Sequence, residues 1–70
     1  MKILIIEDDA DMIDNISQSL QEQDYRVEVA HNYFEAIDKV VMYTYNCILL
    51  DLTLPDGDGL DVLQEIKKQE

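Results

Sequence analysis

Carboxylate side chains follow two of the most apolar stretches of this sequence. Residues 3–6 are aliphatic and run directly into Glu7 and Asp8, and residues 47–50 run into Asp51. If the two stretches are neighbouring parallel strands, these carboxylates converge at one edge of a sheet. Carboxylates held that close repel one another unless a cation lies among them, and hard oxygen ligands suit Mg²⁺. A second interpretation also stands, in which Glu7 and Asp8 cap a helix and Asp51 only begins a loop.

The strands that would carry these side chains are predicted from apolar patterning. The short aliphatic run that ends at Ile6 and the run over residues 46–50 are typical of strands buried on both faces, as in a parallel sheet. Residues 25–29 alternate between apolar and polar side chains, which predicts a strand with one less buried face, at a sheet edge.

Three amphipathic helices are predicted between and after these strands. The first covers residues 11–23 with Asp9 or Asp11 as its cap, the second follows Asn32 and ends near Met42, and the third is capped by Asp58. The side chains expected to face the sheet are Met12, Ile13, Ile16 and Leu20 in the first helix, Phe34, Ala36, Ile37, Val40 and Val41 in the second, and Leu60, Leu63 and Ile66 in the third.

The order of elements is therefore β-α-β-α-β-α, which implies parallel strands joined by right-handed crossovers. With the first strand in the centre, the strand order is 2-1-3. No linker, domain boundary or fixed-period repeat appears in residues 1–70, so we expect one α/β unit.

Composition excludes several classes of protein. Sixteen acids against five bases give a net charge of −11, which argues against nucleic-acid binding through phosphate neutralisation. The apolar runs are far shorter than the ~20 residues of a membrane span, and the acidic seventh residue does not suit a secretory signal. The single cysteine, Cys47, fits a reducing compartment. We expect a cytoplasmic protein that does not bind the membrane.

Other chemical motifs are missing from the sequence. Gly57 and Gly59 are its only glycines, so it has neither a Walker loop nor a dinucleotide-binding GxGxxG. A calcium loop beginning at Asp56 would place Leu60 where an oxygen ligand is required. His31 has no second histidine or cysteine at metal-ligand spacing, and we expect it in a surface loop.

Two motifs, KILIIEDD at residues 2–9 and CILLDLTLPDGDG at residues 47–59, resemble the receiver domain of bacterial two-component response regulators. The resemblance extends over the whole chain and implies a flavodoxin-like, doubly wound parallel sheet. It implies a signalling domain rather than an enzyme, one that accepts a phosphoryl group from the phosphohistidine of a sensor histidine kinase.

The same resemblance implies a role for each matching residue. Asp51 would be the phosphoacceptor. Asp8 would bind Mg²⁺ directly, Glu7 would reach it through water, and Thr53 would offer its backbone carbonyl.

The sequence matches only the first three strand–helix units of such a receiver. The hydroxyl residue and the lysine of the fourth and fifth units have no counterpart, so we expect the N-terminal portion of one domain, with the third strand as an exposed edge. A symmetric homodimer through the third strand and last helix is predicted from this. Its interface would include Ile48, Leu50, Leu60 and Leu63.

Two alternatives to phosphoacceptance remain open from the sequence. The chain could be a structural fragment that self-associates without signalling. It could instead be an acidic module that captures Mg²⁺ or Ca²⁺ without being phosphorylated. Only the phosphoacceptor interpretation predicts a covalent mass gain at Asp51.

Overall fold

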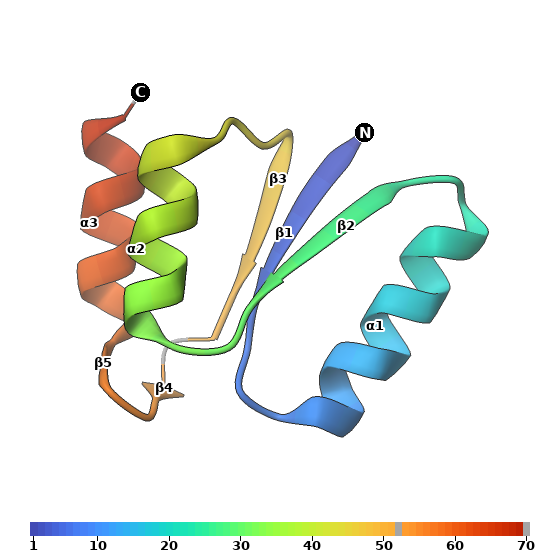
Figure 1. Cartoon of the computed structure of the whole chain (residues 1–70), viewed down its shortest axis with the longest axis horizontal. Helices are drawn as coiled ribbons and strands as arrows, with labels where there is room; N and C mark the ends of the chain where they lie inside the picture. The colour runs from blue at the N-terminus through green and yellow to red at the C-terminus, as the bar shows by residue number, and fades with distance from the viewer. Residues whose placement is uncertain (52, 70) are drawn as a thin grey trace.

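Strands and helices alternate along the chain around a three-stranded sheet (Figure 1). The computed structural model describes residues 1–51 and 53–69. The elements are β1 (Lys2–Ile6), α1 (Ala10–Glu22), β2 (Arg26–Ala30), α2 (Tyr33–Met42), β3 (Cys47–Leu50), β4 (Thr53–Leu54), β5 (Gly57–Asp58) and α3 (Gly59–Lys68). All six predicted elements are present, and a short β4–β5 hairpin, which the sequence indicated only as a turn, precedes α3.

The predicted parallel sheet with strand order 2-1-3 is confirmed. β1 lies in the centre, where Ile3 pairs with Val27 of β2 and with Cys47 of β3. Because β1 has a neighbour on each side and helices over both faces, residues 3–6 are at most 3% exposed. The aliphatic run therefore forms the buried strand that its composition indicates.

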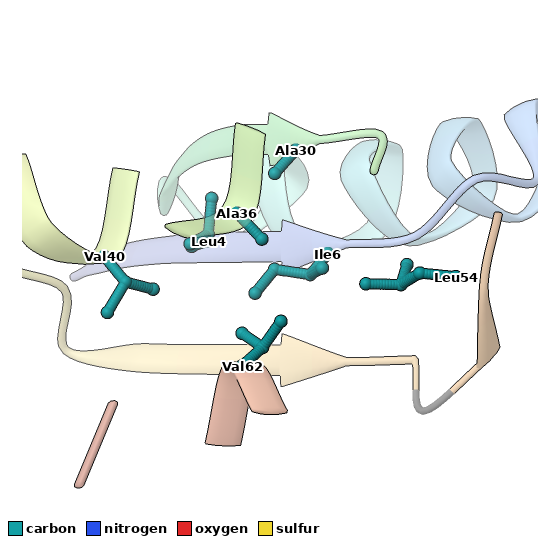
Figure 2. Close-up of a cluster of buried hydrophobic side chains, with 7 residues drawn as sticks. All are labelled: Leu4, Ile6, Ala30, Ala36, Val40, Leu54 and Val62. Atoms are coloured by element: carbon teal, nitrogen blue, oxygen red, sulfur yellow. The ribbon is translucent and has the colours of Figure 1, made fainter. Parts of the chain in front are cut away.

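Two layers of helix enclose the sheet. α1 lies over one face, and α2 and α3 lie side by side over the other (Figure 1). Because successive side chains of a strand point to opposite faces, Leu4 and Ile6 face α2 and α3, and Ile3 and Ile5 face α1. The main core lies on the α2–α3 side (Figure 2) and consists of Leu4, Ile6, Ala30, Ala36, Val40, Leu54 and Val62.

The inward face of α3 differs from the sequence prediction. Val62 is fully buried and Ile66 is half-buried against the core, whereas Leu60 and Leu63 expose 52% and 37% of their surface. Positions 62 and 66 are four residues apart and lie on one side of the helix, so the helix presents that side to the core. The prediction that Leu60 and Leu63 face the sheet is wrong.

α2 shows the same kind of difference. Ala36 and Val40, again four residues apart, are buried, while Phe34 and Val41 are 66% and 50% exposed. Small side chains on the buried side let α2 approach both the sheet and α3 closely, which a face built around Phe34 would prevent. The prediction that Phe34 and Val41 face the sheet is therefore wrong.

β3 is less buried than its apolar sequence predicts. Leu49 is 38% exposed, and the other three residues of the strand are half-buried. In the part of the chain that the structure describes, β3 pairs with β1 on one side only. The expectation of a strand buried on both faces is wrong, and the expectation of an exposed edge is confirmed for these residues.

None of the helices in residues 1–51 and 53–69 is long and apolar enough to cross a membrane.

Candidate functional site

Three carboxylates meet at the carboxyl ends of β1 and β3. One oxygen from each of Glu7, Asp8 and Asp51 lies within 4.8 Å of the other two. Glu7 and Asp51 are half-buried, and Asp8 is exposed. The sequence prediction that these three residues converge is therefore correct in its geometry.

Backbone hydrogen bonds hold two of these residues in place. The Asp51 amide donates to the Ile6 carbonyl at 2.9 Å, and the Glu7 amide donates to the Ala30 carbonyl at 3.0 Å. Both bonds extend the parallel ladders by one residue beyond the strands. The backbone of each residue is therefore part of the sheet, and its side chain starts from a rigid position.

The Glu7 carboxylate lies in an unfavourable electrostatic position. Burial raises the pKa of Glu7, and the negative charge of Asp51 raises it further, while the Asp9 amide acts in the opposite direction. Glu7 Oε1 accepts hydrogen bonds from the amides of Asp8 and Asp9, each at 3.2 Å. These two bonds orient the carboxylate without removing the repulsion from Asp51.

The capping role is assigned to Asp9. Its Oδ1 accepts from the amides of Asp11 and Met12 at 3.0 and 3.2 Å, and Asp9 is the N-cap of α1. Glu7 satisfies the two amides just before the helix, so the two interpretations of Glu7 are compatible. Asp8 is not the cap, which leaves its carboxylate on the same side as Glu7 and Asp51.

Thr53 begins β4, two residues after Asp51, and pairs with Asp58 of β5. This pairing places the Thr53 backbone in a short hairpin that follows Asp51 closely in the sequence. The role of its carbonyl as a metal ligand stays a prediction.

A groove runs along the sheet from the carboxylates toward α1. It is apolar except at the strand ends, and its lining residues are Ile5, Ile6, Glu7, Met12, Ile16, Leu49, Leu50 and Asp51. Met12, predicted to face the sheet, is 47% exposed at this groove. The site therefore has a charged end and an apolar wall.

Sequence reasoning did not find the contacts that dock the β4–β5 hairpin. Asp56 Oδ1 accepts a hydrogen bond from the Tyr33 amide at 2.6 Å, across 23 residues of sequence. The Pro55-Asp56-Gly57 sequence signals a turn, but no local signal names Tyr33 as its partner. His31 is exposed, as predicted, and its ring contacts Glu35 at 3.2 Å.

Replacing Glu7 by glutamine tests whether the ionised Glu7 carboxylate destabilises the folded state. Glu7→Gln keeps an oxygen for the Asp8 and Asp9 amides and removes the charge. Because the folded-state pKa of Glu7 is raised, the folded state holds this proton more tightly than the unfolded state. Wild-type stability should fall relative to the variant as pH rises from about 4, the unfolded value, through the raised pKa.

Urea denaturation with a chelator, over a pH series, measures this difference. The variant should be the more stable protein at neutral pH, and the two stabilities should converge in acid. If the wild type is as stable as Glu7→Gln at neutral pH without divalent ions, the ionised Glu7 carboxylate does not destabilise the fold, and this prediction is wrong.

Comparison with known proteins identifies the family of this chain. Residues 3–70 match the response regulator receiver domain family. The response regulator ArlR of Staphylococcus saprophyticus is 33% identical over 69 residues, which are 99% of this chain and 31% of ArlR. The chain thus spans about a third of the length of such curated relatives.

Solved structures agree with this assignment. The response regulator TrrA of Thermotoga maritima, solved in complex with Mg²⁺-BeF, is 32% identical and superimposes with a TM-score of 0.91, covering 99% of this chain and 60% of that one. TrrA has also been solved in complex with the histidine kinase ThkA.

A third solved structure is the receiver domain of a Pseudomonas aeruginosa sensor histidine kinase, with magnesium coordinated in its active site cleft. It is 32% identical to this chain and superimposes with a TM-score of 0.91, and the match covers 99% of this chain and 57% of that one. The resemblance found in the sequence is confirmed, and with it the flavodoxin-like fold. The chain belongs to the family of response regulator receiver domains.

Proposed function

We propose that this chain is the phosphoacceptor portion of a receiver domain in a two-component phosphorelay, with Asp51 as the accepting residue. One observation carries the proposal: the carboxylate of Asp51 lies within 4.8 Å of those of Glu7 and Asp8, at the edge where parallel sheets bind ligands. Receiver domains are signalling domains, and the role assigned here to the chain is that of an acceptor rather than of an enzyme acting on a metabolite.

The reaction forms one bond and breaks one bond. An Asp51 carboxylate oxygen attacks the phosphorus of a phosphohistidine, the N–P bond breaks, and an acyl phosphate forms on Asp51. The electron pair of the broken bond returns to the histidine nitrogen of the donor. Asp51 suits this role because the bond from its amide to Ile6 fixes the backbone from which the nucleophile projects.

The donor set around Asp51 fits Mg²⁺. Three carboxylate oxygens close together offer hard ligands with excess negative charge. The pKa of Glu7 is raised by burial and further by the charge of Asp51, and a cation nearby would favour the ionised carboxylate. In the proposal Asp8 and Asp51 bind the ion directly, Glu7 acts through water, and Thr53 offers its carbonyl. When bound, Mg²⁺ neutralises charge on the transferring phosphoryl group.

The donor in this proposal is a sensor histidine kinase. The support is the complex of TrrA with the histidine kinase ThkA, in which TrrA is 32% identical to this chain. The proposal includes a cytoplasmic location, and its support is the free cysteine, Cys47.

Phosphorylation by a small-molecule donor tests the role of Asp51. With acetyl phosphate and Mg²⁺, the intact protein should gain the mass of one phosphoryl group, and peptide mapping should locate it on Asp51. Asp51→Asn should show no gain, and Asp61→Asn, which changes an exposed acid of α3, should behave as wild type.

Two outcomes would contradict this assignment. One is a mass gain that persists in Asp51→Asn. The other is a wild type that binds Mg²⁺ and gains no mass at any donor concentration, which would favour the interpretation as an acidic metal-binding module.

We also infer that the chain forms a homodimer through β3 and α3. Its support is the outer edge of β3, which pairs with no other strand in the described residues, together with exposed leucines nearby. Leu49, Leu60 and Leu63 are 38%, 52% and 37% exposed. Ile48 and Leu50 pack against the core instead, so they would support the interface from behind.

Light scattering at micromolar concentration measures this association. The wild type should have about twice the monomer mass of 8.1 kDa. Leu63→Lys should shift the protein to monomer, because it places a charge within an apolar contact. Met42→Lys alters a side chain that is 70% exposed on α2 and should leave the dimer intact. A wild type that stays monomeric and unfolds cooperatively would overturn the dimer.

A further inference from the structure

The β4–β5 hairpin is attached to the rest of the domain at its turn. Leu54, in β4, is 7% exposed and belongs to the main core. Asp56, in the turn itself, reaches across to α2 and accepts the hydrogen bond from the Tyr33 amide at 2.6 Å. The hairpin is therefore held by one apolar anchor and one charge-assisted hydrogen bond.

The Tyr33 amide is a group that needs such a partner. Tyr33 is the first residue of α2, and the amides of a first helical turn have no acceptor within their own helix. The side-chain oxygen of Asn32, the N-cap, already accepts a hydrogen bond from the Glu35 amide at 2.9 Å. A carboxylate at this position also interacts favourably with the positive end of the helix dipole. The contact thus satisfies α2 as well as the hairpin.

Gly57 shows how closely the hairpin approaches α2. A Cβ atom at this position would lie 2.5 Å from Cγ of the Tyr33 ring, which no side chain can tolerate without a shift. The Tyr33 ring cannot move aside freely, because it packs against the core and meets the Phe34 ring edge-on at 5.4 Å. Glycine is required here for close approach.

The β4–β5 hairpin begins at Thr53, whose backbone carbonyl is proposed to bind the metal. Asp51 is fixed to β1 by its amide, and Asp56 and Gly57 are fixed to Tyr33. Thr53 lies between these two attachment points and pairs with Asp58 in the hairpin. The position of its carbonyl therefore depends on the contact with α2 as well as on the sheet.

We propose that Asp56 is a positioning residue for the Mg²⁺ site: by binding the Tyr33 amide, it holds the β4–β5 hairpin where the Thr53 carbonyl completes the ligand set. This inference rests on the proposed function, because it requires Mg²⁺ at the carboxylates of Glu7, Asp8 and Asp51. In this proposal Asp56 acts through the hydrogen bond that its Oδ1 accepts from the Tyr33 amide, and not as a metal ligand.

Mg²⁺ titrations followed by amide NMR test the proposal on the whole chain. Asp56→Ala should weaken Mg²⁺ binding about tenfold, the usual effect of losing a residue that orients metal ligands. It should also speed hydrogen exchange at the Tyr33 amide. Asp56→Asn keeps a carbonyl oxygen for that amide and should restore most of the affinity.

The two controls separate position from charge. Asp38→Ala removes an exposed acid from the same helix α2 and should leave Mg²⁺ affinity unchanged. Gly57→Ala keeps every charge and displaces the hairpin from Tyr33, so it should weaken binding as Asp56→Ala does. If Asp56→Ala does not fold, Gly57→Ala decides the matter.

The outcomes distinguish the positioning role of Asp56 from the proposed Mg²⁺ site on which it rests. A wild type that binds no Mg²⁺ would overturn the proposed metal site. A wild type that binds Mg²⁺, with unchanged affinity in Asp56→Ala or in a folded Gly57→Ala, would overturn only the positioning role. Equal losses in Asp56→Ala and Asp56→Asn would also overturn it, because the effect would then be that of charge.

Discussion

The parallel pairing of β1 with β3 is the constraint on which the other features depend. The two strands are separated by some forty residues of sequence, and their ladder runs in register to the Asp51–Ile6 hydrogen bond. This register brings acids from distant segments to one edge of the sheet. The β4–β5 hairpin, which follows Asp51 in the sequence, docks against Tyr33 at the start of α2. A shift of one residue would separate the carboxylates and reverse the faces of β3.

Two acidic side chains of the sheet region, Glu28 and Glu7, lie in opposite electrostatic environments. In the middle of β2, Glu28 accepts a hydrogen bond from Tyr45 at 2.8 Å and pairs with Lys2 and Lys39, and its pKa is lowered by Tyr45 first and then by the lysines. At the carboxyl edge, the pKa of Glu7 is raised by burial and by Asp51. The first acid is stabilised by the fold, and the second is in an environment that a cation would improve. Local electrostatic cost at one edge is a usual mark of a functional site.

Patterns within short segments predicted most of the fold, and contacts between segments account for the differences. The strand order and the convergence of the carboxylates follow from apolar runs that end in acids. The predicted inward face of α3, with Leu60 and Leu63, is wrong because the helix packs against the core through Val62, a contact that apolar spacing within the helix does not indicate. The Asp56–Tyr33 bond could not be predicted, because it depends on tertiary docking across 23 residues.

Mg²⁺ affinity of two neighbouring variants tests the central claim most directly, namely that the sheet edge gathers specific carboxylates into a cation site. Asp8→Asn removes one of the three converging acids, and Asp9→Asn removes an equal charge from the adjacent residue, which caps α1 instead. In a calorimetric titration, the Asp8 variant should lose at least about tenfold in affinity, or 1.4 kcal/mol. The Asp9 variant should stay close to wild type while it remains folded. Equal losses in the two variants would contradict the account, because binding would then reflect acidic charge alone.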